Sequence, residues 1–332
     1  MTWCPRSVSG MHLPAFAAAE GGLFAEQGLQ VEFVPATRPQ DYSVRGFTAR
    51  VKAVGAGQAD FALTSVVYLL AAQTEAAGSL PVRFVATAHQ RNPIAGVVRE
   101  DSGLRTAEEL AGARTARWSM PWFAQEYAGA LDFMGLAAPV MVDTPGELDP
   151  ALGSGDVDVL PVWIDDTTQA GLQGMRLHHR GAAFDVRAIA LDIPVYTTGL
   201  VAADRMPSDV LASMRDAYLA GYHLQRAQPE LGLAGFRRCF PSVSEEYARA
   251  NWALFEPYAF DGVPPGSMNA GRWQETIAHT AKTHGLSTFP GDRIHRPEML
   301  TPAPDRVALG ERPERDRHAE RKTAPVRGHA GT

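Results

Sequence analysis

The stretch HLPAFAAAEGGLFAEQGLQVEFVP, residues 12–35, decides the fold class. It opens with an alanine-rich segment, His12–Glu20, whose Pro14 stands at an early position that a helix tolerates. Gly21 and Gly22 end that helix, because glycine commonly terminates helices. The closing residues Gln30–Pro35 alternate polar and apolar side chains, which is typical of a half-buried strand. The stretch therefore predicts a helix followed by a strand.

The same alternation of helices and strands continues along the chain. Further strands are predicted at 60–65, 83–88, 94–99, 114–118 and 157–163. Further helices are predicted at 66–72, 106–110, 121–135 and 210–228. In the helix at 121–135, the residues predicted on one face are Phe123, Tyr127, Leu131 and Met134. Strands that alternate with helices indicate an α/β protein whose helices cover both faces of a parallel sheet.

The composition limits the class of protein. The 332 residues are 45% hydrophobic and 20% charged with a net charge of -6, enough for one large or two medium domains and too acidic for a strongly basic nucleic-acid binder. No run reaches the roughly 18 apolar residues that a membrane span needs. We expect neither a nucleic-acid partner nor a membrane span. The mixed charge run at 311–322 predicts that residues 301–332 form a disordered tail, with a partner-binding helix as the alternative.

The two cysteines, Cys4 and Cys239, are too few for a disulfide scaffold and lack the paired spacing of a zinc site. We therefore expect no metal, and no cofactor is predicted. The first residues show no basic segment followed by an apolar stretch, as a secretory signal would. The sequence as it stands predicts a cytoplasmic location, and an extracytoplasmic one if the start is truncated.

The order and spacing of several segments across residues 3–290 resemble a known fold. These segments are the stretch quoted above, AVGAGQADFALTS, LPVRFVATAHQRNPIAGVVREDSGLRTAEELAG, LGSGDVDVLPVWIDD, TTGLVAADRMPSDV and SMNAGRWQETIAHTAKTHGL. Together they resemble the type II periplasmic-binding-protein fold. Within it they resemble the branch that joins sulfonate and nitrate solute-binding proteins (SsuA/TauA-like) with the NMT1/THI5-like group.

The resemblance implies two lobes, each a mostly parallel sheet flanked by helices, with a ligand held between them. Lobe one would comprise residues 1–91 and 196–300, and lobe two residues 92–195. The two crossing strands would fall near Gln90–Ile94 and Pro194–Thr198. In such sheets ligands lie beyond the carboxyl ends of the strands, where helix N-termini expose backbone donors.

The predicted ligand-binding residues lie at those strand ends and crossings. They are Trp3, Arg6, Thr64, Ser65, Asn92, Ser119, Trp122, Trp163, Asp165, Thr197 and Thr198. The hydroxyls of Ser65, Ser119 and Thr198 would hold a small anionic or heterocyclic compound. Trp122 and Trp163 would close on a planar ligand as a sandwich, although large aromatic residues also serve simply to fill a core.

Two functions remain open on this fold. The first is a small-molecule-binding protein, for example for a sulfonate-like ligand, that serves an ABC importer and docks on its permease. The second is a cytoplasmic lyase or hydrolase that cleaves a C–S or C–C bond, with Cys4 as nucleophile or His89 as base.

The enzyme alternative depends on Trp3-Cys4-Pro5, which resembles the Asn-Cys-Pro of sulfinate desulfinases. No clear counterpart of that group's histidine and arginine is present, although Arg45 and Arg50 lie in the region. Cys4 is equally consistent with a small cleft or core thiol, and His89 with a ligand hydrogen bond or a hinge contact.

The pyrimidine-synthase activity of the THI5 group is not expected. Trp3, His12 and Pro14 match the opening of that group. However, Thr64 stands where the group has its cofactor-binding lysine, and Tyr68 stands where it has the histidine that it consumes.

Overall fold

The structure is a computed structural model that describes residues 2–4, 10–34, 44–117, 121–144, 148–164, 176–179, 182–241 and 243–300. The predicted tail at 301–332 lies outside the described residues. In the ranges just given, no helix combines the length and the apolar character needed to cross a bilayer.

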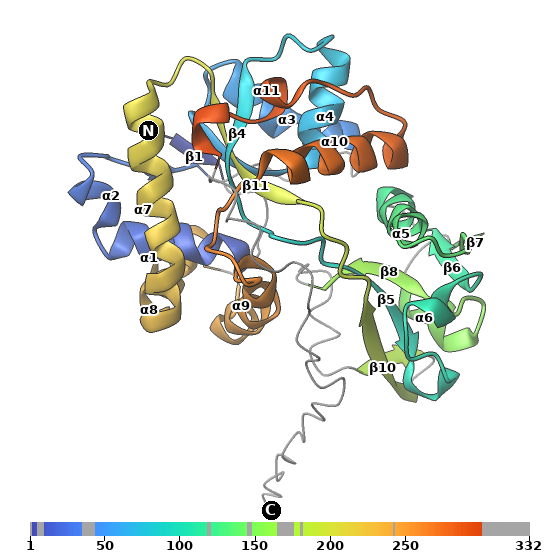
Figure 1. The fold of residues 1–332 in the computed structure, drawn as a ribbon. Helices are drawn as coiled ribbons and strands as arrows, with labels where there is room; N and C mark the ends of the chain where they lie inside the picture. Colours follow the sequence, from blue (N-terminus) through green and yellow to red (C-terminus); the bar gives the residue numbers. More distant parts are fainter. Residues whose placement is uncertain are drawn as a thin grey trace, which may run out of the picture. The chain divides into compact units, whose positions relative to one another are not determined.

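A five-stranded sheet forms the first lobe (Figure 1). Its strands, in spatial order, are β2 (Glu32–Phe33), β1 (Thr2–Cys4), β3 (Phe61–Ser65), β11 (Thr198–Ala203) and β4 (Val82–Thr87). Strand β1 pairs in parallel with β2 and β3, whereas β11 runs antiparallel to both β3 and β4. We call this sheet and its helices lobe one.

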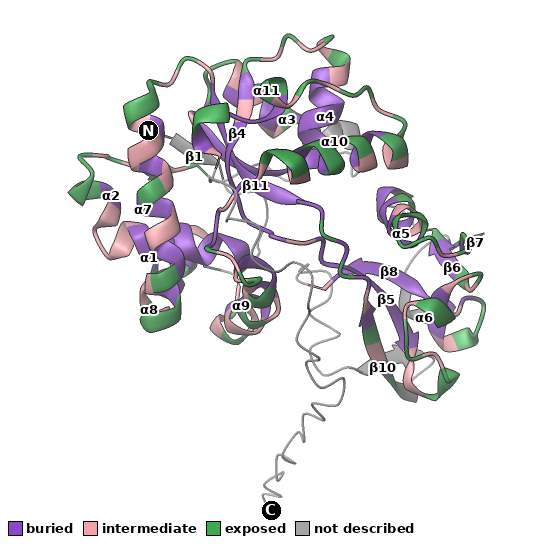
Figure 2. Ribbon diagram, viewed as in Figure 1, coloured by how far each residue is buried: buried purple, intermediate pink, exposed green. Residues whose placement is uncertain are grey.

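The helices of lobe one come from both ends of the described chain. They are η1 (Gly10–His12), α1 (Leu13–Glu20), α2 (Leu23–Glu26), α3 (Val44–Gly55), α4 (Val66–Glu75), α7 (Ser208–Ala227), α8 (Pro229–Cys239), α9 (Glu245–Ala259), α10 (Ala270–His284), α11 (Gly291–Ile294) and η5 (Pro297–Met299). Every residue of β3 and β11 is buried, because helices pack on both faces of the sheet (Figure 2). Strand β3 ends at Ser65, and α4 begins at the next residue, Val66.

Lobe two contains a mixed set of strands. One sheet has four strands, and all of its neighbouring strands are antiparallel. In spatial order they are β8 (Leu160–Trp163), β5 (Ile94–Arg99), β10 (Ala182–Ala190) and β9 (Arg176–His179). Beside it, β6 (Arg114–Arg117) and β7 (Val140–Asp143) pair in parallel, and a bridge between Thr115 and Val159 joins them to the segment that leads into β8. The remaining elements are η2 (Glu100–Ser102), η3 (Glu108–Leu110), α5 (Pro121–Phe133) and α6 (Leu148–Ser154). Among the described residues of this lobe, parallel pairing is limited to β6, β7 and that bridge, because β5 leads away from the crossing and β10 returns beside it. The predicted mostly parallel sheet is therefore wrong for lobe two.

The two crossing segments are hydrogen-bonded to each other. The backbone N–H of Asn92 donates to the Ile193 carbonyl at 3.0 Å, and that of Leu191 donates to the Ile94 carbonyl at 3.1 Å. Arg91 on the first segment forms an ion pair with Asp192 on the second. Both crossings therefore lie near the predicted positions and form one joint between the sheets.

The predicted face of α5 is correct except at its end. Phe123, Tyr127 and Leu131 are fully buried. Met134 is 37% exposed, because the helix ends at Phe133 and Gly135 follows with a φ of 74°. The placement of Met134 on the buried face was wrong.

Helix α10 has a side-chain cap whose removal gives a small, measurable effect. The Asn269 side-chain oxygen accepts a hydrogen bond from the backbone N–H of Arg272 at 3.0 Å. We expect Asn269→Ala to lower the free energy of unfolding by about 1 kcal/mol, because that N–H loses its partner. Asn269→Asp retains an acceptor and should cost less. Urea denaturation of the three proteins tests this, and equal losses for both variants would contradict it.

Candidate functional site

Two of the predicted hydroxyls lie next to each other at the end of β3. Ser65 pairs with Thr198 across the antiparallel β3–β11 ladder, and their side-chain oxygens are 3.4 Å apart. Two further predicted residues, Thr64 and Thr197, are their neighbours in sequence, and Asn92 lies on the first crossing. All three side chains are at most 4% exposed. The sheet thus brings together Ser65 and Thr198, which are 133 residues apart in the sequence.

The N-terminus of α4 starts at the same point. Ser65 is its N-cap residue, but the serine side chain makes no capping hydrogen bond. The N–H of Val66 donates to the Thr197 carbonyl at 2.7 Å. The first N–H groups of a helix have no intrahelical acceptor, and the helix dipole adds positive partial charge there. This end of α4 is therefore suited to an anionic group.

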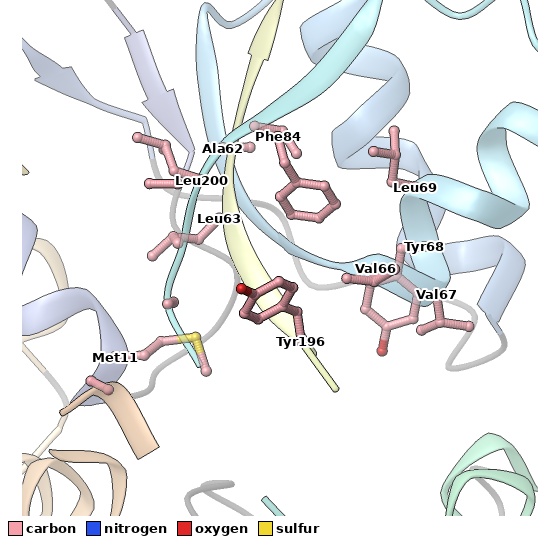
Figure 3. Packing of buried hydrophobic residues seen from close by; sticks show 14 of the residues in the cluster. Met11, Ala62, Leu63, Val66, Val67, Tyr68, Leu69, Phe84, Tyr196 and Leu200 are labelled. Atoms are coloured by element: carbon pink, nitrogen blue, oxygen red, sulfur yellow. The ribbon is translucent and has the colours of Figure 1, made fainter. Parts of the chain in front are cut away.

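A small polar cavity adjoins this helix end. Its volume is about 10 Å³, and its lining residues are Val66, Val67, Asn92, Glu126, Val195, Tyr196, Thr197 and Thr280. Figure 3 shows Val66, Val67 and Tyr68 at the start of α4. Tyr196 lies nearby, on the segment that leads into β11. The Thr197 hydroxyl is buried and has no hydrogen-bond partner among the described residues. The cavity has room for about one water molecule.

Trp122 and Trp163 do meet, but not as a sandwich. Their ring centroids are 5.3 Å apart and the ring planes are inclined at 77°, an edge-to-face contact. A planar ligand between two rings needs parallel planes about 7 Å apart, twice the usual contact distance. The predicted sandwich is therefore absent from this conformation. Trp122 instead packs edge-to-face on Tyr68 of α4 with centroids 5.8 Å apart.

His89 is fully buried just after β4. Its ring has edge-to-face contacts with Trp163, Phe255 and Tyr258 at centroid distances of 6.3, 5.1 and 6.4 Å. Its backbone N–H donates to the Thr198 carbonyl at 3.2 Å. These contacts place His89 beside the joint between the lobes.

Strand β1 contains two further predicted residues, Trp3 and Cys4. The backbone of Cys4 is paired with Ala62, so Cys4 lies at the end of β1 beside the start of β3, three residues before Ser65. The side chains of Trp3 and Cys4 are not described. Arg6, Ser119 and Asp165 lie outside the described residues.

Glu126 is a buried residue of this site that sequence reasoning missed. It is 6% exposed, and its Oε1 accepts a hydrogen bond from the Asn92 side-chain amide at 2.7 Å. Its other oxygen lies 3.9 Å from Nε2 of His284 on α10. The available signal was its position four residues after Trp122, which puts both residues on one face of α5.

Comparison with known proteins identifies the family. The NMT1/THI5-like family model matches residues 9–231. The chain belongs to the NMT1/THI5-like family. No curated protein matches this NMT1/THI5-like protein in sequence.

Solved structures show that this NMT1/THI5-like protein has the fold of periplasmic binding proteins. A periplasmic sulfonate-binding protein, SsuA, of a putative sulfonate ABC transporter from Methylobacillus flagellatus KT has a TM-score of 0.61 at 15% identity, over 90% of this chain and 92% of that one. The aliphatic sulphonate-binding SsuA from Escherichia coli has a TM-score of 0.59 at 16% identity, over 94% and 97%. The alkanesulfonate-binding SsuA from Xanthomonas axonopodis pv. citri, bound to MOPS, has a TM-score of 0.52 at 14% identity, over 90% and 96%. The predicted family and two-lobed fold are confirmed.

Proposed function

We propose that this protein binds a small anionic or heterocyclic compound between its lobes and delivers it to the permease of an ABC importer. The observation that carries the proposal is the convergence of the Ser65 and Thr198 hydroxyls, 3.4 Å apart, at the N-terminus of α4. Hydroxyl and backbone donors at a helix N-terminus bind an anion without requiring a buried cation. The fold shared with sulfonate-binding proteins supports a sulfonate-like group as the anion.

The proposed role implies a location outside the cytoplasm, because an import receptor must meet its ligand before transport. The periplasmic proteins with this fold support that location. The lobe boundaries at 91/92 and 195/196 remain part of the proposal. They agree with a hinge made of the two hydrogen-bonded crossings, about which the lobes would open and close.

A ligand panel tests the binding function directly. Alkanesulfonates, arylsulfonates, sulfinates, aromatic acids and pyrimidines are each added to the purified chain, and thermal unfolding and mass spectrometry are recorded. We expect at least one compound to raise the melting temperature and to be recovered unchanged. A ligand present at 100 times its dissociation constant stabilises the folded state by about 2.7 kcal/mol.

Ser65→Asp locates the anion. A carboxylate at this N-cap repels an anionic ligand, so we expect its affinity to fall by about 100-fold or more, since like charges in close contact cost several kcal/mol. Ser79→Asp adds the same charge at an exposed serine and should leave the affinity unchanged. Isothermal titration calorimetry of the three proteins measures this. Equal affinity in Ser65→Asp and wild type would exclude the end of α4 as the anion site.

The panel also separates the receptor from the enzyme. A compound that the wild type converts would overturn the receptor function, and the Cys4→Ser variant would then show whether Cys4 takes part. Absence of any bound compound in the panel would contradict the proposed ligand class.

A further inference from the structure

Helix α5 presents one continuous face to lobe one. Residues spaced by three or four share one side of a helix. On this face lie Trp122, Glu126, Gly129 and Phe133. Trp122 meets Tyr68 at the start of the helix, and Phe133 packs edge-to-face on His279 at its end, with ring centroids 5.4 Å apart. The contact with lobe one therefore runs along the whole length of α5, and α10 forms its outer part (Figure 1).

The middle of this contact is polar and buried. The side chains of Glu126 and His284 are 8% and 3% exposed, and their nearest atoms are 3.9 Å apart. His284 also places Nδ1 3.3 Å from the side-chain oxygen of Gln125. Asn92, on the first crossing, donates to Glu126 and accepts from the N–H of Ile94 at 3.0 Å. The polar groups of α5, α10 and the crossing are thus mutually arranged in this closed position.

Two further contacts fix the spacing of the helices. Gly129 allows close approach, because a Cβ atom at this position would overlap with the side chain of Thr283. One turn away, Lys282 Nζ lies 2.5 Å from Asp132 Oδ2.

We propose that α5 and α10 form a latch that holds the lobes closed without ligand. The latch consists of the pairs Glu126–His284, Gly129–Thr283 and Asp132–Lys282. It must separate whenever the hinge opens, because α5 belongs to lobe two and α10 to lobe one. The inference rests on the proposed function, in that the closed lobes are taken to enclose the ligand site.

The latch sets how readily a ligand enters. The cavity at the end of α4 has a volume of about 10 Å³, so the closed form cannot admit a whole ligand. Only the open fraction of the protein can then bind, and the apparent dissociation constant rises as that fraction falls. Weakening the latch should therefore open the ligand-free protein.

Gly129→Leu tests the latch without any ligand. The added side chain collides with Thr283 and should keep the helices apart. Small-angle X-ray scattering of the full chain is expected to show the radius of gyration rising by about 1 Å, as expected for a hinge movement of more than about 2 Å. Ala227→Leu adds a leucine at an exposed position of α7, a helix that packs on α1, α2 and α8, and as the control it should scatter like wild type. Far-UV circular dichroism verifies that both variants are folded.

A charge exchange gives a second test in case Gly129→Leu does not fold. Asp132→Lys faces Lys282 with a like charge, and at low ionic strength it should shift the scattering in the same direction as Gly129→Leu. The double variant Asp132→Lys/Lys282→Asp restores the pair and should return the curve to wild type. Wild-type scattering in folded Gly129→Leu and Asp132→Lys would overturn the latch. A radius of gyration of the ligand-free wild type that matches an open arrangement of the lobes would also overturn it. Because these measurements use no ligand, a negative result would not contradict the proposed binding function. Conversely, a ligand panel in which no compound binds would not contradict the latch.

Discussion

Replacing Gly221 by valine should lower the free energy of unfolding by about 3 kcal/mol or more. Gly221 lies on α7 where it crosses α1, and a Cβ atom there would overlap with the Pro14 carbonyl oxygen and lie 3.0 Å from Cβ of Ala18. A backbone oxygen cannot move aside as a side chain can, so the two helices must separate and the core must repack. Urea denaturation followed by circular dichroism measures the loss.

Asp216→Val is the matched control for this effect. It places the same β-branched residue in the same helix at a side chain that is 57% exposed. The control should lose about 1 kcal/mol or less, through helix propensity and a surface ion pair. A similar loss in both variants would show that the effect comes from valine in a helix and not from the crossing of α1 and α7.

Mild acid should destabilise the protein through two histidines on α10. Burial, together with the smaller effect of the positive charge of His279, lowers the pKa of His284 to about 4. Burial also lowers the pKa of His279 to about 4, although Asp132 acts in the opposite direction. An unfolded chain has a histidine pKa near 6.5, so between pH 6.5 and 4 the unfolded state takes up protons that the folded state does not.

The free energy of unfolding should therefore fall as the pH decreases through this range and be insensitive to these residues above it. At pH 4, each histidine lowers the free energy of unfolding by up to about 3 kcal/mol relative to its value above pH 6.5. Denaturant titrations at several pH values measure the slope for wild type and His284→Gln. The variant should have a shallower slope, whereas His223→Gln, at an exposed position of α7, should keep that of wild type. Identical slopes in all three would contradict the role of burial at His284.

The sequence predicted the fold where local pattern and topology agree. Apolar runs such as Phe61–Ser65 and Ile94–Arg99 became buried strands at or near their predicted limits. The glycine signal at Gly21 and Gly22 placed the end of α1 correctly. The helix at Val44–Gly55 was not predicted, although Phe47, Val51 and Val54 recur at helical spacing. The β9–β10 hairpin was not predicted either, because Arg176–His179 contains one apolar residue and no alternating pattern.

The candidate site was predicted in part. Ser65 and Thr198 lie side by side because both stand at the ends of neighbouring strands, which the resemblance placed correctly in space. The perpendicular contact of Trp122 with Trp163 could not be predicted, because the orientation of the two rings depends on how α5 packs on β8 within lobe two. Glu126 was overlooked for a different reason. A glutamate on a helix is most often solvent-exposed, and only the position of α10 buries this one.

The place of β11 in the first sheet has a consequence for how the chain folds. This strand lies between β3 and β4, yet Ser65 and its partner Thr198 are 133 residues apart in the sequence. A nascent chain that has delivered β1 to β4 still lacks the strand that joins β3 to β4, and lobe two is made in between. Such high contact order makes folding slow, since loop closure precedes the stabilising contacts. The first sheet therefore cannot be completed until the chain has been synthesised as far as β11.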